Sequence, residues 1–163
     1  MSDLAAQVGV ALQARGWSLV TAESCTGGGV AQAITEIAGS SAWFERGFVT
    51  YANLAKIEML GVRASTLAAH GAVSEMTVRE MAIGALMHSQ AQVSLAVSGI
   101  AGPGGGSPDK PVGTVWFAWA FPDNLIVAQH FLLSGSRTEV RQQAVNIALQ
   151  GLLNQLDQIV KAV

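Results

Sequence analysis

The sequence contains few of the residues that disulfides, metal sites and polyanion-binding surfaces require. It has one cysteine, three histidines and only nine lysines and arginines in 163 residues. The single Cys25 excludes an internal disulfide, and the histidines lack metal-ligand spacing. A formal net charge of −2 provides no basic surface for nucleic acid. We therefore expect neither a metal ion nor a nucleic-acid partner.

Long apolar runs are also missing, although half of the residues are hydrophobic and only 12% are charged. No stretch approaches the roughly 20 apolar residues of a membrane-spanning helix. Residues 1–20 lack the basic start and apolar run of a signal peptide. We expect a cytoplasmic protein that does not contact membranes. The low charge favours a surface covered by a second copy, in a homo-oligomer that is a dimer or larger.

The chain length and the lack of repeats or linkers predict one domain over residues 1–163. Helical periodicity and helix stop signals are seen at 4–15, 30–38, 53–60, 75–87 and 140–159, with Asn53 and Ser74 as candidate N-caps. Strand-like runs are seen at 17–24, 46–51, 93–99, 114–121 and 125–133. We expect an α/β fold: a layered α/β/α domain with a mixed, mainly parallel sheet. Residues 93–99 would be its central strand, and 114–133 a C-terminal antiparallel hairpin.

Hydroxyl side chains occur where predicted strands end. Ser24, Tyr51 and Ser98 lie at such ends, which in α/β proteins border the ligand-binding crevice. Ser24 precedes three glycines in TAESCTGGG (21–29), and these allow a ligand to approach N–H groups at the start of a helix. A hydroxyl beside such donors suits acyl transfer. The alternative is that Ser24 or Thr26 simply caps the helix.

Two residues are candidate bases for Ser24. His70 is better placed than the other histidines, although its position beside a glycine also fits capping of a helix C-terminus. Lys56 acts as a base only if burial or positive charge lowers its pKa, and otherwise it is a surface lysine. Tyr51, the only tyrosine, can orient Lys56 or relay a proton to it. Cys25 is an alternative nucleophile, although no histidine or asparagine partner is apparent.

Two further stretches are candidates for binding an anion. The glycine-rich loop SGIAGPGGGSPDKPVG (98–113) either cradles a phosphate or is a plain connection, and it is neither a Walker A motif nor a dinucleotide fingerprint. Arg137 and Arg141 lie four residues apart at the start of the last predicted helix. Arginines there oppose the helix dipole, which favours an anionic partner, although intramolecular carboxylates would serve equally well.

Four motifs, ESCTGG, GFVTY, SGIAGP and KPVGTV, make the chain resemble a known family. From about Leu4 to Leu156 it is similar to the C-terminal domain of the competence-damage-inducible CinA proteins. Stand-alone members of that family are nicotinamide-nucleotide amidases. They convert nicotinamide mononucleotide (NMN) and water to nicotinic acid mononucleotide and ammonia, which recycles pyridine nucleotides towards NAD. The resemblance implies NMN as substrate and no cofactor.

The resemblance also implies roles for individual residues. Ser24 would be the nucleophile, completed by Tyr51 and Lys56. The implied substrate-binding residues are Thr26, Gly27 and Gly28 on the oxyanion side, then Ser98, Gly99 and Gly102, with Arg137 or Arg141 at the phosphate. Ala52 and Leu54 stand where members often carry polar residues. Two hypotheses therefore stay open: a weakly catalytic paralogue that binds or senses pyridine nucleotides, and an amidase for another small amide.

Overall fold

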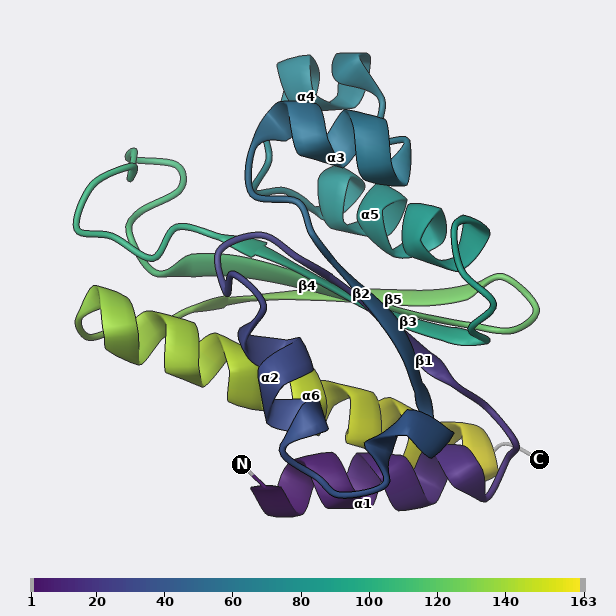
Figure 1. Cartoon of the computed structure of the whole chain (residues 1–163). Helices are drawn as coiled ribbons and strands as arrows, with labels where there is room; N and C mark the ends of the chain where they lie inside the picture. Colours follow the sequence, from purple (N-terminus) through teal and green to yellow (C-terminus); the bar gives the residue numbers. More distant parts are fainter. Residues whose placement is uncertain (1, 162–163) are drawn as a thin grey trace.

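A computed structural model describes residues 2–161 of the chain (Figure 1). The helices are α1 (Ser2–Gln13), α2 (Gly29–Thr35), α3 (Asn53–Leu60), α4 (Ala64–His70), α5 (Glu75–Met87) and α6 (Arg137–Lys161), with a 3₁₀ turn, η1, at Ser40–Ala42. The strands are β1 (Leu19–Glu23), β2 (Phe44–Val49), β3 (Val93–Gly99), β4 (Thr114–Phe121) and β5 (Leu125–Leu132). None of these helices has the length and apolar character needed to cross a membrane.

The five strands form one mixed sheet in the order β2-β1-β3-β4-β5. β1 runs parallel to β2 and β3, whereas β4 runs antiparallel to β3 and β5. The α/β class, the central β3 and the C-terminal hairpin are confirmed, and parallel and antiparallel pairings are equal in number. α1, α2 and α6 cover one face of the sheet, and α5 with α3 and α4 outside it covers the other (Figure 1).

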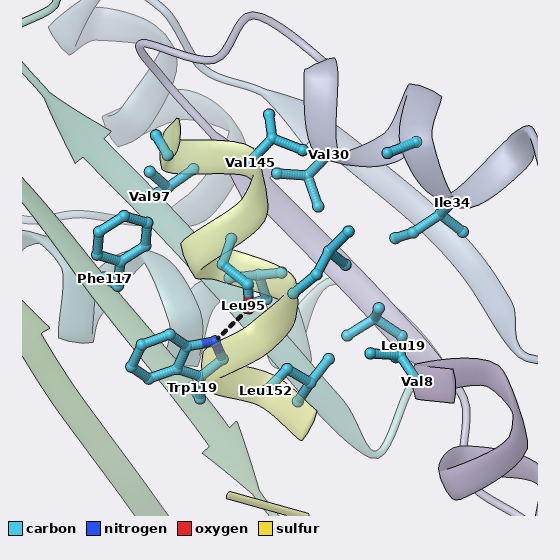
Figure 2. Packing of buried hydrophobic residues seen from close by; sticks show 14 of the residues in the cluster. Val8, Leu19, Val30, Ile34, Leu95, Val97, Phe117, Trp119, Val145 and Leu152 are labelled. Carbon is cyan, nitrogen blue, oxygen red and sulfur yellow. Dashed lines mark hydrogen bonds between the residues drawn. The ribbon is translucent and has the colours of Figure 1, made fainter. Parts of the chain in front are cut away.

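The core under α6 fixes that helix against the sheet (Figure 2). The Trp119 indole of β4 is fully buried and donates a hydrogen bond to the Ala148 carbonyl of α6 at 3.0 Å. A Cβ at Gly151 would lie only 2.2 Å from the Trp119 ring, so glycine is required for this close packing. Burying a side chain of this size stabilises the fold by about 1.5–3 kcal/mol. This contact fixes the middle of α6 against β4.

The opposite face of the sheet carries small side chains, which let α5 approach closely. Ala22, Ala96 and Ala118 of the strands pack in one buried cluster with Met81 and Leu60. α3 in turn crosses α5 at Gly84, where a Cβ would lie 1.8 Å from the Leu60 carbonyl oxygen. This packing fixes α3, the helix that carries Lys56.

The two predicted helix caps have different outcomes. Ser74 caps α5 as expected, since its Oγ accepts a hydrogen bond from the Thr77 N–H at 3.2 Å. The prediction that Asn53 is an N-cap is wrong. Ala52 is extended and its carbonyl accepts the first helical hydrogen bond, from the Lys56 N–H at 3.2 Å. Asn53 is therefore already inside the first turn of α3.

Candidate active site

A cavity of about 260 Å³, here called the Ser24 cavity, opens at the carboxyl ends of β1, β2 and β3. The loop after β3 and the start of α6 complete its wall. The structure brings seven of the residues expected from the sequence to this cavity: Ser24, Tyr51, Lys56, Ser98, Gly99, Gly102 and Arg137. Segments that are more than 100 residues apart in the chain therefore meet at one edge of the sheet.

Ser24 and Lys56 are in direct contact. The Ser24 N–H donates to the Val97 carbonyl at 3.0 Å, which anchors the residue to β3. Lys56 Nζ lies 3.0 Å from Ser24 Oγ, 2.8 Å from the Thr50 carbonyl oxygen and 3.1 Å from that of Tyr51. The Lys56 side chain is only 1% exposed, and it makes no ion pair within residues 2–161. The surface-lysine alternative is therefore wrong.

The surroundings of Lys56 favour its neutral form. Burial lowers the pKa of the Lys56 ammonium, because removal from water penalises the charged state. A neutral amine has two N–H donors and one lone pair. With the donors on the carbonyls of Thr50 and Tyr51, the lone pair is left to accept the hydroxyl proton of Ser24. The geometry thus places the Lys56 amine within hydrogen-bond distance of the Ser24 hydroxyl.

Tyr51 contacts Lys56 through its backbone carbonyl, and its side chain extends elsewhere. The residue is 60% exposed, and its hydroxyl accepts a hydrogen bond from Arg137 Nη2 at 3.1 Å. Arg137 Nη1 also donates to the Gly102 carbonyl at 2.8 Å. Arg137 therefore links Tyr51 to the glycine-rich loop at the cavity wall, and the phenol lies beside a cation rather than beside Lys56.

The turn after Ser24 is held by Glu23, a residue to which the sequence analysis gives no role. Glu23 is 1% exposed, and its carboxylate accepts hydrogen bonds from Thr26 Oγ1 at 2.6 Å, Val30 N at 2.8 Å and Ala31 N at 3.0 Å. It thereby caps α2, whose N-cap position is Gly28 with no side-chain cap of its own. The capping alternative for Ser24 and Thr26 is wrong. A carboxylate shortly before a predicted helix start was the available signal.

Four residues expected at the substrate do not line the Ser24 cavity. Gly27 and Gly28 form the turn itself, with φ of 61° and 102° that favour glycine. Thr26 and Arg141 instead line a second cavity of about 450 Å³ between α2 and α6, here called the α2–α6 cavity. Arg141 Nε donates to the Cys25 carbonyl at 3.0 Å and Nη2 to that of Thr26 at 3.3 Å.

The alternative nucleophile and base are placed unfavourably. Burial raises the pKa of the Cys25 thiol to about 11, so the thiolate needed for attack is scarce at neutral pH. His70 ends α4 outside the Ser24 cavity, and its carbonyl accepts a hydrogen bond from Lys110 Nζ. Within residues 2–161, no cluster of three His, Cys, Asp or Glu side chains is arranged to hold a metal ion.

The two departures from the family pattern lie on the surface. Ala52 is exposed, Leu54 is 63% exposed, and neither lines the Ser24 cavity. Their neighbour Asn53 does line it. The hydrogen bonds of Lys56 Nζ therefore involve neither of these two residues.

Comparisons with known proteins agree along nearly the whole chain. The CinA C-terminal domain profile matches residues 1–156. Nicotinamide-nucleotide amidohydrolase PncC of Escherichia coli strain K12 is 59% identical over 155 residues, which cover 95% of this chain and 94% of that protein. PncC of Pseudomonas putida is 48% identical over 94% of this chain and 95% of its own length. The crystal structure of competence/damage inducible protein CihA from Agrobacterium tumefaciens has a TM-score of 0.91 at 48% identity, covering 94% of both chains.

Proposed function

The chain belongs to the CinA C-terminal domain family, and we propose that it is a nicotinamide-nucleotide amidohydrolase that converts NMN and water to nicotinic acid mononucleotide and ammonia. The observation that carries the proposal is the buried Lys56 amine 3.0 Å from Ser24 Oγ, inside a cavity. A serine paired with a neutral lysine is an activated nucleophile that suits hydrolysis of an amide C–N bond. The high identity to PncC over the full length supports NMN as the amide.

The reaction begins with proton transfer from Ser24 to Lys56. Ser24 Oγ attacks the carboxamide carbon, which the positively charged pyridinium ring makes electrophilic, and the C=O electron pair moves onto the oxygen. When that pair returns, the C–N bond breaks and Lys56 gives its proton to the departing ammonia. A water molecule then loses its proton to Lys56 and attacks the acyl-enzyme, which releases the acid and restores Ser24.

Backbone donors of the turn after Ser24 stabilise the oxyanion in this proposal. Such donors act where negative charge develops, and removing one raises the barrier by about 2.7–4 kcal/mol. Val30 and Ala31 are not available for this role, because Glu23 already occupies their N–H groups. The donors are thus expected nearer to Ser24 than the start of α2.

Arg137 is the better placed of the two arginines for the substrate phosphate. It lines the Ser24 cavity and is linked to Tyr51 and Gly102 at the cavity wall, whereas Arg141 lines the α2–α6 cavity. Ser98 and Gly99 form the wall on the β3 side. In this arrangement, Tyr51 contributes its carbonyl to Lys56 and its hydroxyl to the phosphate end of the substrate.

The test is ammonia release from NMN by the purified protein, with Ser24→Ala and the exposed Ser41→Ala as variant and matched control. We expect release by the wild type and by Ser41→Ala, and none by Ser24→Ala. Calorimetric NMN binding without release would favour the binding or regulatory paralogue. Faster release from nicotinamide riboside or nicotinamide than from NMN would favour another small amide.

We also propose that the protein acts in the cytoplasm as a homo-oligomer, a dimer or larger. Support comes from β5, an outer strand of eight residues without proline or charged side chains (Figure 1). The Leu133 N–H donates to the Gly113 carbonyl at 2.8 Å, so alternation turns the backbone groups of Ala128, His130 and Leu132 away from β4. Such an edge is suited to pair with β5 of a second copy.

The other outer strand, β2, is protected against such pairing. It contains the Glu45–Arg46 ion pair, and Arg46 also donates to the His88 carbonyl at 3.0 Å.

The test of the β5 pairing is light scattering of Leu132→Lys, at a residue that is 67% exposed, and this variant should lose the oligomer. Val10→Lys, at an exposed position of α1, is the matched control and should leave it intact. A monomeric wild type would contradict the assembly, and cell fractionation checks the location.

A further inference from the structure

Arg141 holds the back of the turn that carries the nucleophile. It reaches from α6 to two successive carbonyls, those of Cys25 at 3.0 Å and Thr26 at 3.3 Å. A Cβ at Gly27 would lie 3.3 Å from Arg141 Nη2, so glycine leaves room for the guanidinium. Because Arg141 faces the α2–α6 cavity, these contacts come from the side away from the Ser24 cavity.

The contact with Cys25 determines the direction of one N–H group. In a planar trans peptide the carbonyl oxygen and the following N–H lie on opposite sides. Since the Cys25 oxygen is turned towards Arg141, the N–H of Thr26 is turned away from it. Cys25, the other residue of this peptide, lines the Ser24 cavity. The Thr26 N–H has no hydrogen-bond partner within residues 2–161. Buried backbone N–H groups are otherwise nearly always paired.

The N–H groups of Cys25 and Gly28 also lack a partner within the described residues, whereas four other donors of the turn are occupied by the protein. Their hydrogen bonds join Gly27 N to Ser24 O, Gly29 N to Thr26 O, and Val30 N and Ala31 N to the Glu23 carboxylate. The Thr26 N–H, two residues after the nucleophile, is therefore one of three free donors of the turn, and it is the one whose peptide carbonyl is held by Arg141. A carbonyl that accepts a bond from a cation also polarises its peptide, which strengthens the N–H as a donor.

We propose that Arg141 is a positioning residue, which holds the Cys25–Thr26 peptide so that the Thr26 N–H donates to the carboxamide oxygen as it becomes negative, and that it does not bind the substrate phosphate. This inference rests on the proposed amidase function. In the step concerned, the Ser24 Oγ–carbon bond forms, the C=O electron pair moves to the oxygen, and the Ser24 proton passes to Lys56. Arg141 touches neither substrate nor reacting atoms.

The test compares Arg141→Gln and Arg141→Lys with Arg137→Gln on NMN and on nicotinamide riboside, which lacks the phosphate. Loss of one oxyanion donor lowers kcat by roughly 10²–10³-fold, so we expect Arg141→Gln to lower kcat by at least about tenfold. Its KM for NMN should stay nearly unchanged, with the same loss on both substrates. Arg137→Gln should instead raise KM for NMN. A raised KM for NMN with unchanged kcat in Arg141→Gln would overturn the proposal.

A structural control separates positioning from loss of stability. Gln142→Ala changes the next residue of α6, which also lines the α2–α6 cavity, and it should keep the wild-type kcat. Arg141→Lys keeps the charge but presents a single ammonium to two carbonyls, so it should recover only part of the loss. A kcat loss in Gln142→Ala equal to that in Arg141→Gln would count against positioning by the Arg141 guanidinium. Full recovery in Arg141→Lys would count against the need for a guanidinium that contacts both carbonyls.

A second measurement keeps the inference testable if NMN is not the substrate. Phenylmethanesulfonyl fluoride labels an activated serine: the Ser24 Oγ–sulfur bond forms, fluoride leaves and Lys56 takes the proton. If the wild type is labelled but releases no ammonia, the substrate assignment fails, and slower labelling of Arg141→Gln still supports positioning. Equal labelling rates in both proteins would overturn it. A wild type that is neither labelled nor active would remove the nucleophile and this inference together.

Discussion

Arg137 and Arg141 lie one helical turn apart on α6, yet their guanidinium groups face different cavities. Arg137 faces the Ser24 cavity and links Tyr51 to Gly102, whereas Arg141 faces the α2–α6 cavity and holds the carbonyls of Cys25 and Thr26. The turn after Ser24 separates the two cavities. The same residue type can thus meet substrate on one side and support the backbone on the other.

The two sides of the turn also differ in their buried ionisable groups. In the Ser24 cavity, Lys56 is buried without an ion-pair partner among residues 2–161, which suits proton transfer. Behind the turn, Glu23 is buried with three hydrogen-bond donors, and this suits a fixed structure. Changes on the cavity side should therefore reduce activity more than stability, and changes behind the turn should reduce stability.

The largest expected effect is that of Lys56→Met on activity. It removes the proposed base and adds no polar group, although the carbonyls of Thr50 and Tyr51 lose a donor. Ammonia release from NMN should fall by at least about 10²–10⁴-fold, the usual contribution of acid–base catalysis. The folded structure should remain. Steady-state kinetics and circular dichroism check both expectations. Lys110→Met, outside the Ser24 cavity, is the matched control, and near-normal turnover in Lys56→Met would refute the base assignment.

The contact that this prediction concerns was only partly accessible from the sequence. The alternation of strand and helix identified Ser24 and Tyr51 at strand ends, because periodicity is a local property. That Lys56, 32 residues from Ser24, touches its hydroxyl depends on how β1 and β2 pair and how α3 packs on α5. Lys56 contacts the carbonyl of Tyr51 rather than its hydroxyl. This contact follows from the path of the backbone between β2 and α3, which the side-chain chemistry of tyrosine does not predict.

The residues behind the turn were harder to predict than the base. Arg137 and Arg141 share one helix face, so their spacing could not separate their roles; only the position of α6 relative to the turn does so. Glu23 caps α2 across an intervening loop, with its bonds to Val30 and Ala31 seven and eight residues away. Local capping patterns extend over only three or four residues, so they do not reveal this cap. The N-cap prediction for Asn53 fails for a related reason, because the residue preference at a cap does not determine where the helix begins.

Glu23→Gln should give the next largest effect, on stability. The amide keeps one acceptor oxygen but turns an NH₂ group towards N–H donors, and each buried group left unpaired costs about 1–3 kcal/mol. Urea denaturation should show a loss of this size. Glu36→Gln, at the exposed end of α2, should leave the free energy of unfolding unchanged. Wild-type stability in Glu23→Gln would mean that the carboxylate does not hold the turn.

A smaller effect is expected in the pH dependence of stability. Burial lowers the pKa of Lys56 in the folded protein below its unfolded value of about 10.4. Between the two pKa values the unfolded chain binds more protons, so stability rises with pH across that window and levels off above it. Lys56→Met should lack this rise. Urea denaturation of both proteins as the pH is raised measures the difference, and parallel curves would show that the folded pKa is not lowered.

The smallest effect is expected for Thr26→Val. This variant tests whether the Thr26 side chain serves only the structure of the turn while its backbone N–H serves the reaction. The variant loses the hydroxyl that donates to Glu23 but keeps the backbone N–H. Because Glu23 retains its bonds from Val30 and Ala31, stability should fall by only about 1 kcal/mol, and kcat should change by no more than a few-fold. Thermal unfolding and ammonia release measure both quantities. A variant as stable as the wild type but inactive would place the Thr26 hydroxyl at the substrate, and the separation between a reactive side and a supporting side of the turn would no longer hold.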